Sequence, residues 1–113
     1  MRMWMVAPEV LCRKHLLGEH VECHMLIGSL RLKRSVKKYV EYGLIDTSKV
    51  QERHDALAIE IERRGYNHKS PLIIDFPLVF VGTVDVENSY KELSTRCAVC
   101  AENIKHYKEA KNG

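Results

Sequence analysis

Three side chains near the start of the sequence have the types and the spacing for acid–base chemistry. His15, Glu19 and Glu22 stand at i, i+4 and i+7, and at 100° per residue a helix places them within roughly 60° of one another. Leucine and valine flank this stripe, so we expect it to be partly buried, where a carboxylate needs a partner or a raised pKa. The spacing predicts a functional site or, as the simpler alternative, a polar strip paired with arginines such as Arg53 or Arg64.

Cysteines and histidines offer a second kind of chemistry, because Cys97 and Cys100 form a C-x-x-C pair. Such a pair suits a redox role, or half of a zinc site whose two further ligands come from elsewhere in the fold. The candidates for those two ligands are Cys12, Cys23, His20 and His24. Both cysteines of the pair also fall on an apolar stripe, so packing in the core is the simpler interpretation. The helical spacing of His20, Cys23 and His24 is compatible with a metal too, although ordinary surface histidines explain it equally simply.

Length and composition indicate one folded domain. The 113 residues suffice for one modest core, and 45% hydrophobic with 29% charged residues is ordinary for a folded protein. A net charge of +3 permits binding to polyanions without requiring it. No secretory signal precedes the cysteines, so we expect reduced thiols and a cytoplasmic protein. The longest apolar stretch, 71–84, contains Asp75 and Pro77 and is too short to span a bilayer, which argues against a membrane role.

The elements that must position these groups are helices. Residues 1–7 have the pattern of an extended arm, and apolar periodicity predicts helices over about 8–32, 46–64 and 88–108. One apolar stripe follows the last of them, formed by Tyr90, Leu93, Cys97, Cys100, Ile104 and Tyr107. Residues 66–86 mix prolines and glycine with β-branched residues, which fits an extended packed connection or one short hairpin. We therefore predict an all-α fold, a compact three-helix domain over 1–113 with an N-terminal arm and a long extended connection before the last helix.

Basic residues gather where the first predicted helix ends. They are Arg31, Lys33, Arg34, Lys37 and Lys38. An exposed helix end would place their charges favourably against the C-terminal dipole. The same cluster also suits contacts to phosphate groups, and the two interpretations stand side by side.

Two blocks of the sequence resemble a known family. Residues 11–22, with the pattern His-Leu-x-x-Glu-x-x-Glu, are similar to the first helix of the pyrimidine dimer DNA glycosylases, whose prototype is a phage enzyme. The segment 53–72, which contains Arg-Arg-Gly-Tyr-Asn-His-Lys-Ser-Pro, is similar to the end of the family's second helix and the following loop. Together with the arm these blocks cover about half of the chain. The resemblance implies a mainly helical fold and a DNA glycosylase with AP-lyase activity.

The resemblance also implies a mechanism. In the family the α-amino group of the mature chain attacks C1′ of a damaged nucleotide that is flipped from double-stranded DNA, and a Schiff base to the sugar remains. Met1 takes that position here, because Arg2 is too large for methionine removal and Met1 is expected to be retained. Glu22 matches the glutamate that assists the proton transfers and strand cleavage. An α-amine, with an ordinary pKa of about 7.7–8.0, is appreciably neutral near pH 7, so no metal or organic cofactor is required.

Further site residues follow from the same resemblance. Arg2, His15 and Glu19 would position the sugar and phosphate, and the partner is damaged double-stranded DNA with no protein partner evident. The electrostatic candidates for DNA binding are Arg13, Arg31, Lys33, His68 and Lys69. The chain departs from the family pattern at Val21 and Met25, where the prototype has arginines, and in lacking an aromatic, basic tail. The alternatives are a non-catalytic relative that binds nucleic acid or protein, and N-glycosidic chemistry on another nucleotide substrate.

Overall fold

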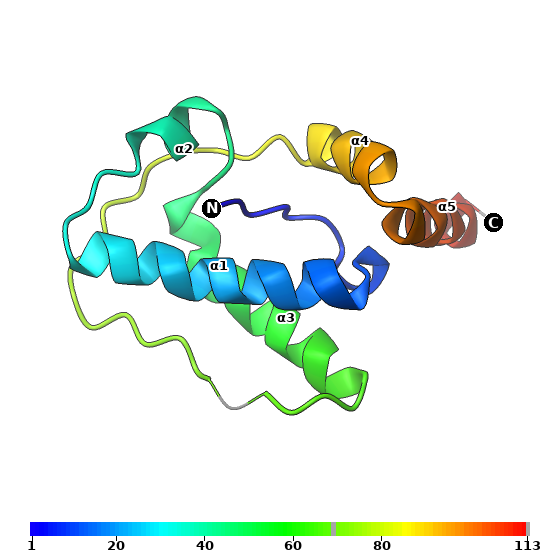
Figure 1. The fold of residues 1–113 in the computed structure, drawn as a ribbon, viewed down its shortest axis with the longest axis horizontal. Coiled ribbons are helices and arrows are strands. Elements are labelled where there is room, and N and C mark those ends of the chain that lie inside the picture. The colour runs from blue at the N-terminus through cyan, green and yellow to red at the C-terminus, as the bar shows by residue number, and fades with distance from the viewer. Residues whose placement is uncertain (69, 113) are drawn as a thin grey trace.

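The computed structural model describes residues 1–68 and 70–112, and over these residues it contains helices and no strand (Figure 1). The predicted all-α class is therefore confirmed. The helices are α1 (Arg13–Arg31), α2 (Lys37–Glu41), α3 (Val50–Arg63), α4 (Val86–Arg96) and α5 (Ala98–Asn112), with single 3-10 turns η1 (Pro8–Val10) and η2 (Thr47–Lys49). Lys69, one of the predicted DNA contacts, lies outside the described residues.

Over the residues that the structure describes, five α-helices replace the three that periodicity predicts. The first predicted helix starts later, at Arg13, because Cys12 has extended backbone angles (φ −67°, ψ 166°) and separates α1 from the turn η1. The last predicted helix is broken at Cys97, whose extended backbone (φ −136°, ψ 113°) divides it into α4 and α5. The apolar stripe continues on both sides of the break, since Leu93, Cys100 and Ile104 are all buried. The chain turns at Cys97 so that α5 packs beside η1.

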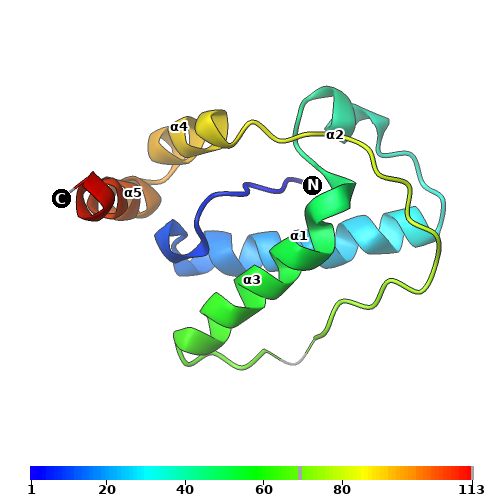
Figure 2. The ribbon, with the colours of Figure 1, turned by 180° about the vertical axis from the view of Figure 1, so that it is seen from behind.

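The core forms where α1 crosses α3, and the N-terminal arm runs beside that crossing (Figures 1 and 2). Leu16 and Leu26 of α1 meet Leu57 of α3 in one buried apolar cluster. The arm belongs to the same cluster, because Met3 is almost completely buried and its backbone N–H donates to the Leu44 carbonyl at 2.7 Å. Each fully buried apolar side chain of this size contributes about 1.5–3 kcal/mol. The first residues are thus held by the core.

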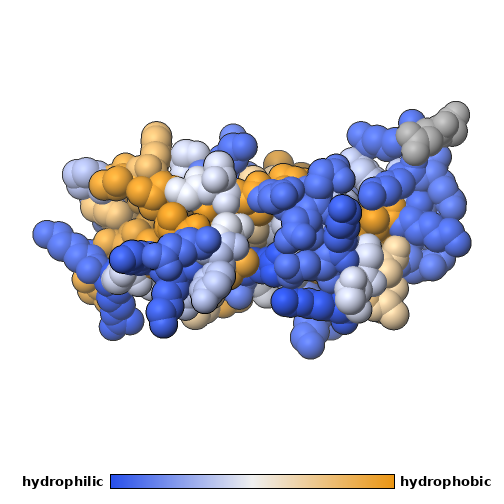
Figure 3. Space-filling model, turned by 90° about the horizontal axis from the view of Figure 1, so that it is seen from above, coloured by the Kyte–Doolittle hydropathy of each residue, from blue (hydrophilic) through white to orange (hydrophobic). Residues whose placement is uncertain are grey.

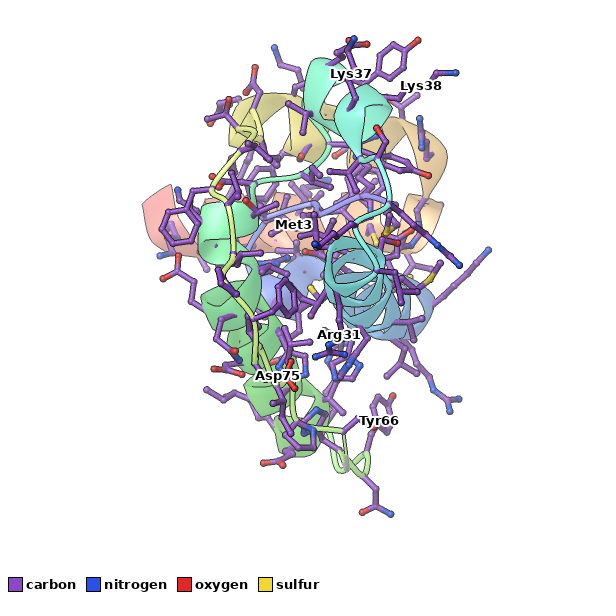
Figure 4. All side chains as sticks on the ribbon, turned by 90° about the vertical axis from the view of Figure 1, so that its left-hand side faces the viewer. Met3, Arg31, Lys37, Lys38, Tyr66 and Asp75 are labelled. Atoms are coloured by element: carbon purple, nitrogen blue, oxygen red, sulfur yellow. The ribbon has the colours of Figure 1, made fainter. Side chains whose placement is uncertain are left out.

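The connection between α3 and α4 is extended, as one of the two sequence alternatives proposed, and it wraps around the outside of the helices (Figure 2). Arg31 holds it at one point by donating from Nε and Nη2 to Asp75 Oδ1 at 3.2 and 3.0 Å, and Figure 4 shows the two side chains together. Thr47 holds it at another, donating to the Val79 carbonyl at 2.8 Å. Gly82 has φ +86°, and a Cβ there would collide with backbone atoms, so this turn requires glycine.

The surface is uneven in polarity. Viewed from above, apolar side chains gather toward the side of α2 and the long connection, whereas the α5 side is mostly hydrophilic (Figure 3). The exposed apolar side chains include Tyr42, Val79 and Phe80. Within residues 1–68 and 70–112, none of the helices is long and apolar enough to cross a membrane.

Candidate active site

The first peptide unit of the chain meets Glu22. The backbone N–H of Arg2 donates to Glu22 Oε2 at 3.1 Å, which joins the start of the arm to the middle of α1. Met1 carries the α-amino group on the other side of the same peptide, and the positive charge of that group acts on the Glu22 carboxyl. Burial raises the pKa of Glu22, and the Arg2 N–H and the amine charge only partly oppose this rise. The arrangement brings an amine and a proton-accepting carboxyl together.

A cavity of about 270 Å³ opens beside this contact. Its size is near the lower end of the range for small-molecule sites. The lining residues are Arg2, Trp4, Lys14, His15, Gly18, Glu19, Glu22 and Arg96. All three members of the stripe predicted from the sequence therefore face one cavity. Gly18 leaves room in its wall, since no atom lies within 4 Å of where its Cβ would stand.

Glu19 forms the floor of the cavity. It is 1% exposed, and its two carboxylate oxygens accept from Arg53 Nε and Nη2 at 2.6 and 2.9 Å. Arg53 also donates to the Val6 carbonyl, so the same arginine holds the N-terminal arm. Both carboxylate oxygens of Glu19 are thus hydrogen-bonded to Arg53, and a contact between Glu19 and the substrate stays a prediction. The alternative pairing with Arg53 is the one that the structure shows, and it fixes α1, α3 and the arm relative to one another.

Arg2 lies at the rim of the cavity in a network of charged and aromatic groups. Its guanidinium carbon stands 3.8 Å from the Trp4 ring centroid, and its Nη1 donates to Glu92 Oε2 at 2.6 Å. Arg96 contacts the same carboxylate oxygen at 3.2 Å. The Nε atom of Arg2 is buried and has no hydrogen-bond partner among the described residues. Arg2 therefore lines the cavity, and its predicted contact with the sugar and phosphate stays a prediction.

His15 connects the cavity to a group of cysteines. Its ring meets Trp4 edge to face at 6.1 Å between centroids, on the cavity side. Its Nδ1 lies 3.1 Å from Cys12 Sγ and 3.6 Å from Cys100 Sγ. Burial lowers the pKa of His15, and the charges of Lys14 and Arg96 lower it further. The ring is thus an uncharged imidazole near neutral pH, with one nitrogen directed at thiols.

Comparison with known proteins shows which family the chain belongs to. The family model for pyrimidine dimer DNA glycosylase matches residues 1–74. The chain belongs to the pyrimidine dimer DNA glycosylase family. Neither the curated proteins nor the solved structures contain a significant match to the chain. The match to the glycosylase family covers the arm, α1 and α3, and hence every lining residue of the cavity except Arg96.

Three other basic residues suggested by the resemblance, Arg13, Arg31 and Lys33, do not line the Glu22 cavity. Arg31 lies nine residues beyond Glu22, roughly 13 Å along α1, and is engaged with Asp75. Lys33 is exposed just after α1 with a left-handed backbone (φ +57°). Arg13 is exposed at the opposite end of α1, with its guanidinium 5.1 Å from the Tyr66 ring centroid. Lys37 and Lys38 of the basic cluster project outward from α2 (Figure 4).

His68, also predicted as a DNA contact, belongs to a cluster of imidazoles. Its Nε2 lies 2.9 Å from His20 Nε2, and the ring centroids of His20 and His54 are 4.7 Å apart. His54 is buried with both nitrogens facing acceptors, the Asp55 carboxylate at 2.9 Å and the Ser70 carbonyl at 3.1 Å. The cluster therefore attaches the segment after α3 to α1 by hydrogen bonds.

The metal site considered for His20, Cys23 and His24 does not form. Cys23 is fully buried, and burial raises the pKa of its thiol to about 12. His24 instead meets the Ser70 carbonyl through Nε2 at 3.0 Å, beside His54. Helical spacing alone placed these residues near one another without showing that the cysteine faces the core.

Four lining residues of the Glu22 cavity, Trp4, Lys14, Gly18 and Arg96, were missed by the sequence analysis. Lys14 stands at i, i+4 and i+8 with Gly18 and Glu22, which is a helical-face signal that the sequence did contain. Trp4 sits in the arm, where no periodicity shows which side chains turn inward. Arg96 comes from α4, and its approach depends on the turn at Cys97, which the continuous apolar stripe concealed.

Proposed function

We propose that this chain is a DNA glycosylase with AP-lyase activity that uses the α-amino group of Met1 as its nucleophile. The amine lone pair forms a bond to C1′ of the damaged nucleotide as the C1′–N bond to the base breaks, and the base leaves. The amine nitrogen then gives up a proton, its lone pair expels O4′ as the C1′–O4′ bond breaks, and that proton ends on O4′. The iminium that results acidifies the 2′ position. Glu22 accepts a 2′ proton there, and the bond to the 3′ oxygen breaks, which cuts the strand.

One observation carries this proposal, the hydrogen bond from the Arg2 N–H to Glu22 at 3.1 Å. It holds the proposed base beside the peptide next to the amine, on the wall of a cavity with room for a sugar. The raised pKa of Glu22, caused by burial, brings the carboxyl closer to neutral pH, where both uptake and release of a proton are accessible. Membership of the glycosylase family supports the same assignment.

The charged groups at the cavity support a DNA substrate. Arg2, Lys14 and Arg96 place three cations around the cavity that holds Glu22. Phosphates on either side of a flipped nucleotide would meet these cations, which fix the sugar without reading the base sequence. We propose that the His15 ring, which lines the same cavity, donates a hydrogen bond to the sugar or phosphate. Because the proposed substrate is cellular or viral DNA, we propose that the protein acts inside a cell.

A second candidate function is a non-catalytic relative that binds nucleic acid or protein through the same face. The observation that favours it is the exposure of Val21 and Met25, at 52% and 54%, on either side of Glu22. Apolar side chains at these positions can pack against a bound partner, but they carry no positive charge that could bind a phosphate group. Such a relative would bind duplex DNA in a salt-dependent way and would cut none of its lesions.

Strand cleavage on a panel of lesions separates these functions. The panel contains duplexes with one thymine dimer, one abasic site, one modified base or no lesion, and the variants are Glu22→Gln and Glu109→Gln. We expect the wild-type chain and Glu109→Gln to cut the dimer or abasic duplex and Glu22→Gln to lose this activity, because Glu109 is an exposed residue of α5. Cleavage of a modified-base duplex alone would indicate N-glycosidic chemistry on another substrate. Binding without cleavage on every duplex would favour the non-catalytic relative.

A further inference from the structure

Four side chains from two distant parts of the chain converge beside the cavity. Cys12 precedes α1 and His15 lies in its first turn, while Cys97 separates α4 from α5 and Cys100 lies in the first turn of α5. Their ligand atoms, three Sγ and one imidazole nitrogen, all lie within 4.8 Å of one another. The C-x-x-C pair thus meets a Cys-x-x-His pair, whose histidine the sequence analysis did not consider as a ligand.

The spacing of these atoms fits the edges of a tetrahedron around one ion. Bonds of about 2.3 Å to sulfur and about 2.0–2.1 Å to nitrogen give edges of about 3.8 Å between sulfurs and about 3.5 Å between sulfur and nitrogen. The Cys12 and Cys97 sulfurs are 3.9 Å apart. His15 Nδ1 lies 3.1 Å from Cys12 Sγ and 3.6 Å from Cys100 Sγ. The four groups therefore need little movement to surround a metal.

Backbone N–H groups point at two of the sulfurs. The Cys12 N–H donates to Cys100 Sγ at 3.3 Å, and the Cys100 N–H donates to Cys97 Sγ at 3.5 Å. Amide donors of this kind stabilise thiolates and orient them as ligands, as the outer groups of metal sites do. Cys23 provides an internal comparison, since it is fully buried on α1 and takes no part in this convergence. Packing of cysteine as a small apolar side chain requires none of these contacts.

Disulfide bonding does not explain the cluster. The Cys12 and Cys97 sulfurs are 3.9 Å apart, far beyond the 2.03–2.05 Å of an S–S bond, and all four cysteines of the chain are free thiols. Oxygen-preferring ions such as Mg²⁺ and Ca²⁺ do not suit three sulfurs and one imidazole. A tetrahedral set of three thiolates and one imidazole matches structural Zn²⁺ sites.

We propose that Cys12, His15, Cys97 and Cys100 bind one structural Zn²⁺ ion. All four positions come from the protein, so the site is closed and the ion serves to join elements, with no open position for substrate. It would fasten α4 and α5, which lie beyond the part of the chain that the family model matches, to the start of α1. Arg96 is the neighbour of Cys97 and lines the Glu22 cavity, so the ion also positions that cation. With Nδ1 on the ion, the Nε2–H of His15 is the ring donor left for substrate.

Metal content of the purified full-length chain tests this site directly. The chain is produced in zinc-supplemented medium without an affinity tag, dialysed, and analysed by plasma mass spectrometry. We expect one zinc per chain for the wild type and for the matched control Cys23→Ser, and near-zero zinc for Cys97→Ser and Cys100→Ser. Absence of stoichiometric zinc in the wild type, or full retention of zinc in both C-x-x-C variants, would overturn the site.

A spectroscopic measurement keeps the test decisive if a variant fails to fold. Replacement of zinc by Co²⁺ in the wild-type chain should give thiolate-to-cobalt charge-transfer absorption and the intense visible bands of tetrahedral cobalt, and added Zn²⁺ should abolish both. Removal of the ion with a chelator should lower the thermal midpoint, because the ion binds only the folded arrangement. Weak octahedral cobalt spectra without charge transfer would contradict thiolate ligation. Neither readout depends on DNA cleavage, so the site stands or fails separately from the proposed function.

Discussion

The carboxyl of Glu22 accepts a hydrogen bond at 3.1 Å from the backbone N–H of Arg2, twenty residues earlier in the chain. This contact exists because the arm between them is buried. Met3 and Val6 pack into the core, and Arg53 holds the Val6 carbonyl while its other donors bind Glu19. Packing and a buried ion pair therefore fix the position of the first residues. They also fix the position of these residues relative to Glu22.

Replacement of Glu22 by glutamine removes the proposed proton acceptor and keeps the shape of the side chain. We expect the rate of strand cleavage at abasic sites to fall by about 10²–10⁴-fold, the usual contribution of a positioned acid or base. The thermal midpoint should change little, because the amide oxygen still accepts from the Arg2 N–H. Single-turnover cleavage and a thermal melt, each with Glu109→Gln as the control, measure the two effects. Cleavage at the wild-type rate would remove Glu22 from the mechanism.

The titration of Glu22 can be followed without any substrate. Burial raises its pKa, so we expect the side-chain carboxyl carbon to titrate in NMR with a midpoint above the ordinary value of about 4.3. The amine charge opposes this rise, hence acetylation of the N-terminus should move the midpoint further up. A group with a raised pKa makes folding less favourable as the pH rises through that pKa. A midpoint at or below the ordinary value, or no response to acetylation, would contradict this electrostatic picture.

Loss of one partner of the Glu19–Arg53 pair should be costly. Both side chains are buried, and Arg53→Met leaves an uncompensated carboxylate, which we expect to lower the free energy of unfolding by about 3–5 kcal/mol. The double variant with Glu19→Met as well removes both charges and should recover much of that loss. Urea unfolding of the two single variants and the double variant measures the coupling. Additive effects of the two substitutions would show that the pair is not coupled.

The imidazole cluster should make the protein acid-sensitive. Burial lowers the pKa of His20 from 6.5 to about 4, with the neighbouring histidine charges adding to the effect. A lowered histidine pKa gives stability that is complete above about pH 6.5 and is lost as the pH falls toward about 4. We expect the thermal midpoint of His20→Gln to fall less over this range than that of the wild type. His106→Gln, at an exposed residue of α5, is the matched control and should follow the wild type.

The sequence predicted those parts of the fold whose signals are local. Helical periodicity located α1 and α3, and the spacing of His15, Glu19 and Glu22 placed them on one cavity wall. The break at Cys97 had no local signal, because apolar residues recur through it at unchanged spacing and only the extended backbone of one residue interrupts the helix. Periodicity reports which face is buried, and it does not report where a helix changes direction.

The part of the candidate site that lies on one helix could be predicted from the sequence. Glu22 and Glu19 share α1, and the pairing of Glu19 with Arg53 was one of the alternatives that the sequence allowed. Contacts across elements were not predictable, such as Arg96 at the cavity or the approach of the C-x-x-C pair to His15. Those contacts depend on how α4 and α5 pack against α1. That packing involves residues far apart in the sequence, so no local pattern predicts it.

The most direct test of the proposed mechanism is the identity of the atom that bonds to the sugar. The wild-type chain is mixed with an abasic duplex in the presence of borohydride, which reduces a Schiff base to a stable amine, and the trapped complex is digested and analysed by mass spectrometry. We expect a single adduct on the N-terminal peptide, with fragment ions that place the added mass on the α-nitrogen of Met1. An adduct on a lysine such as Lys14, or no adduct alongside normal strand cleavage, would contradict it.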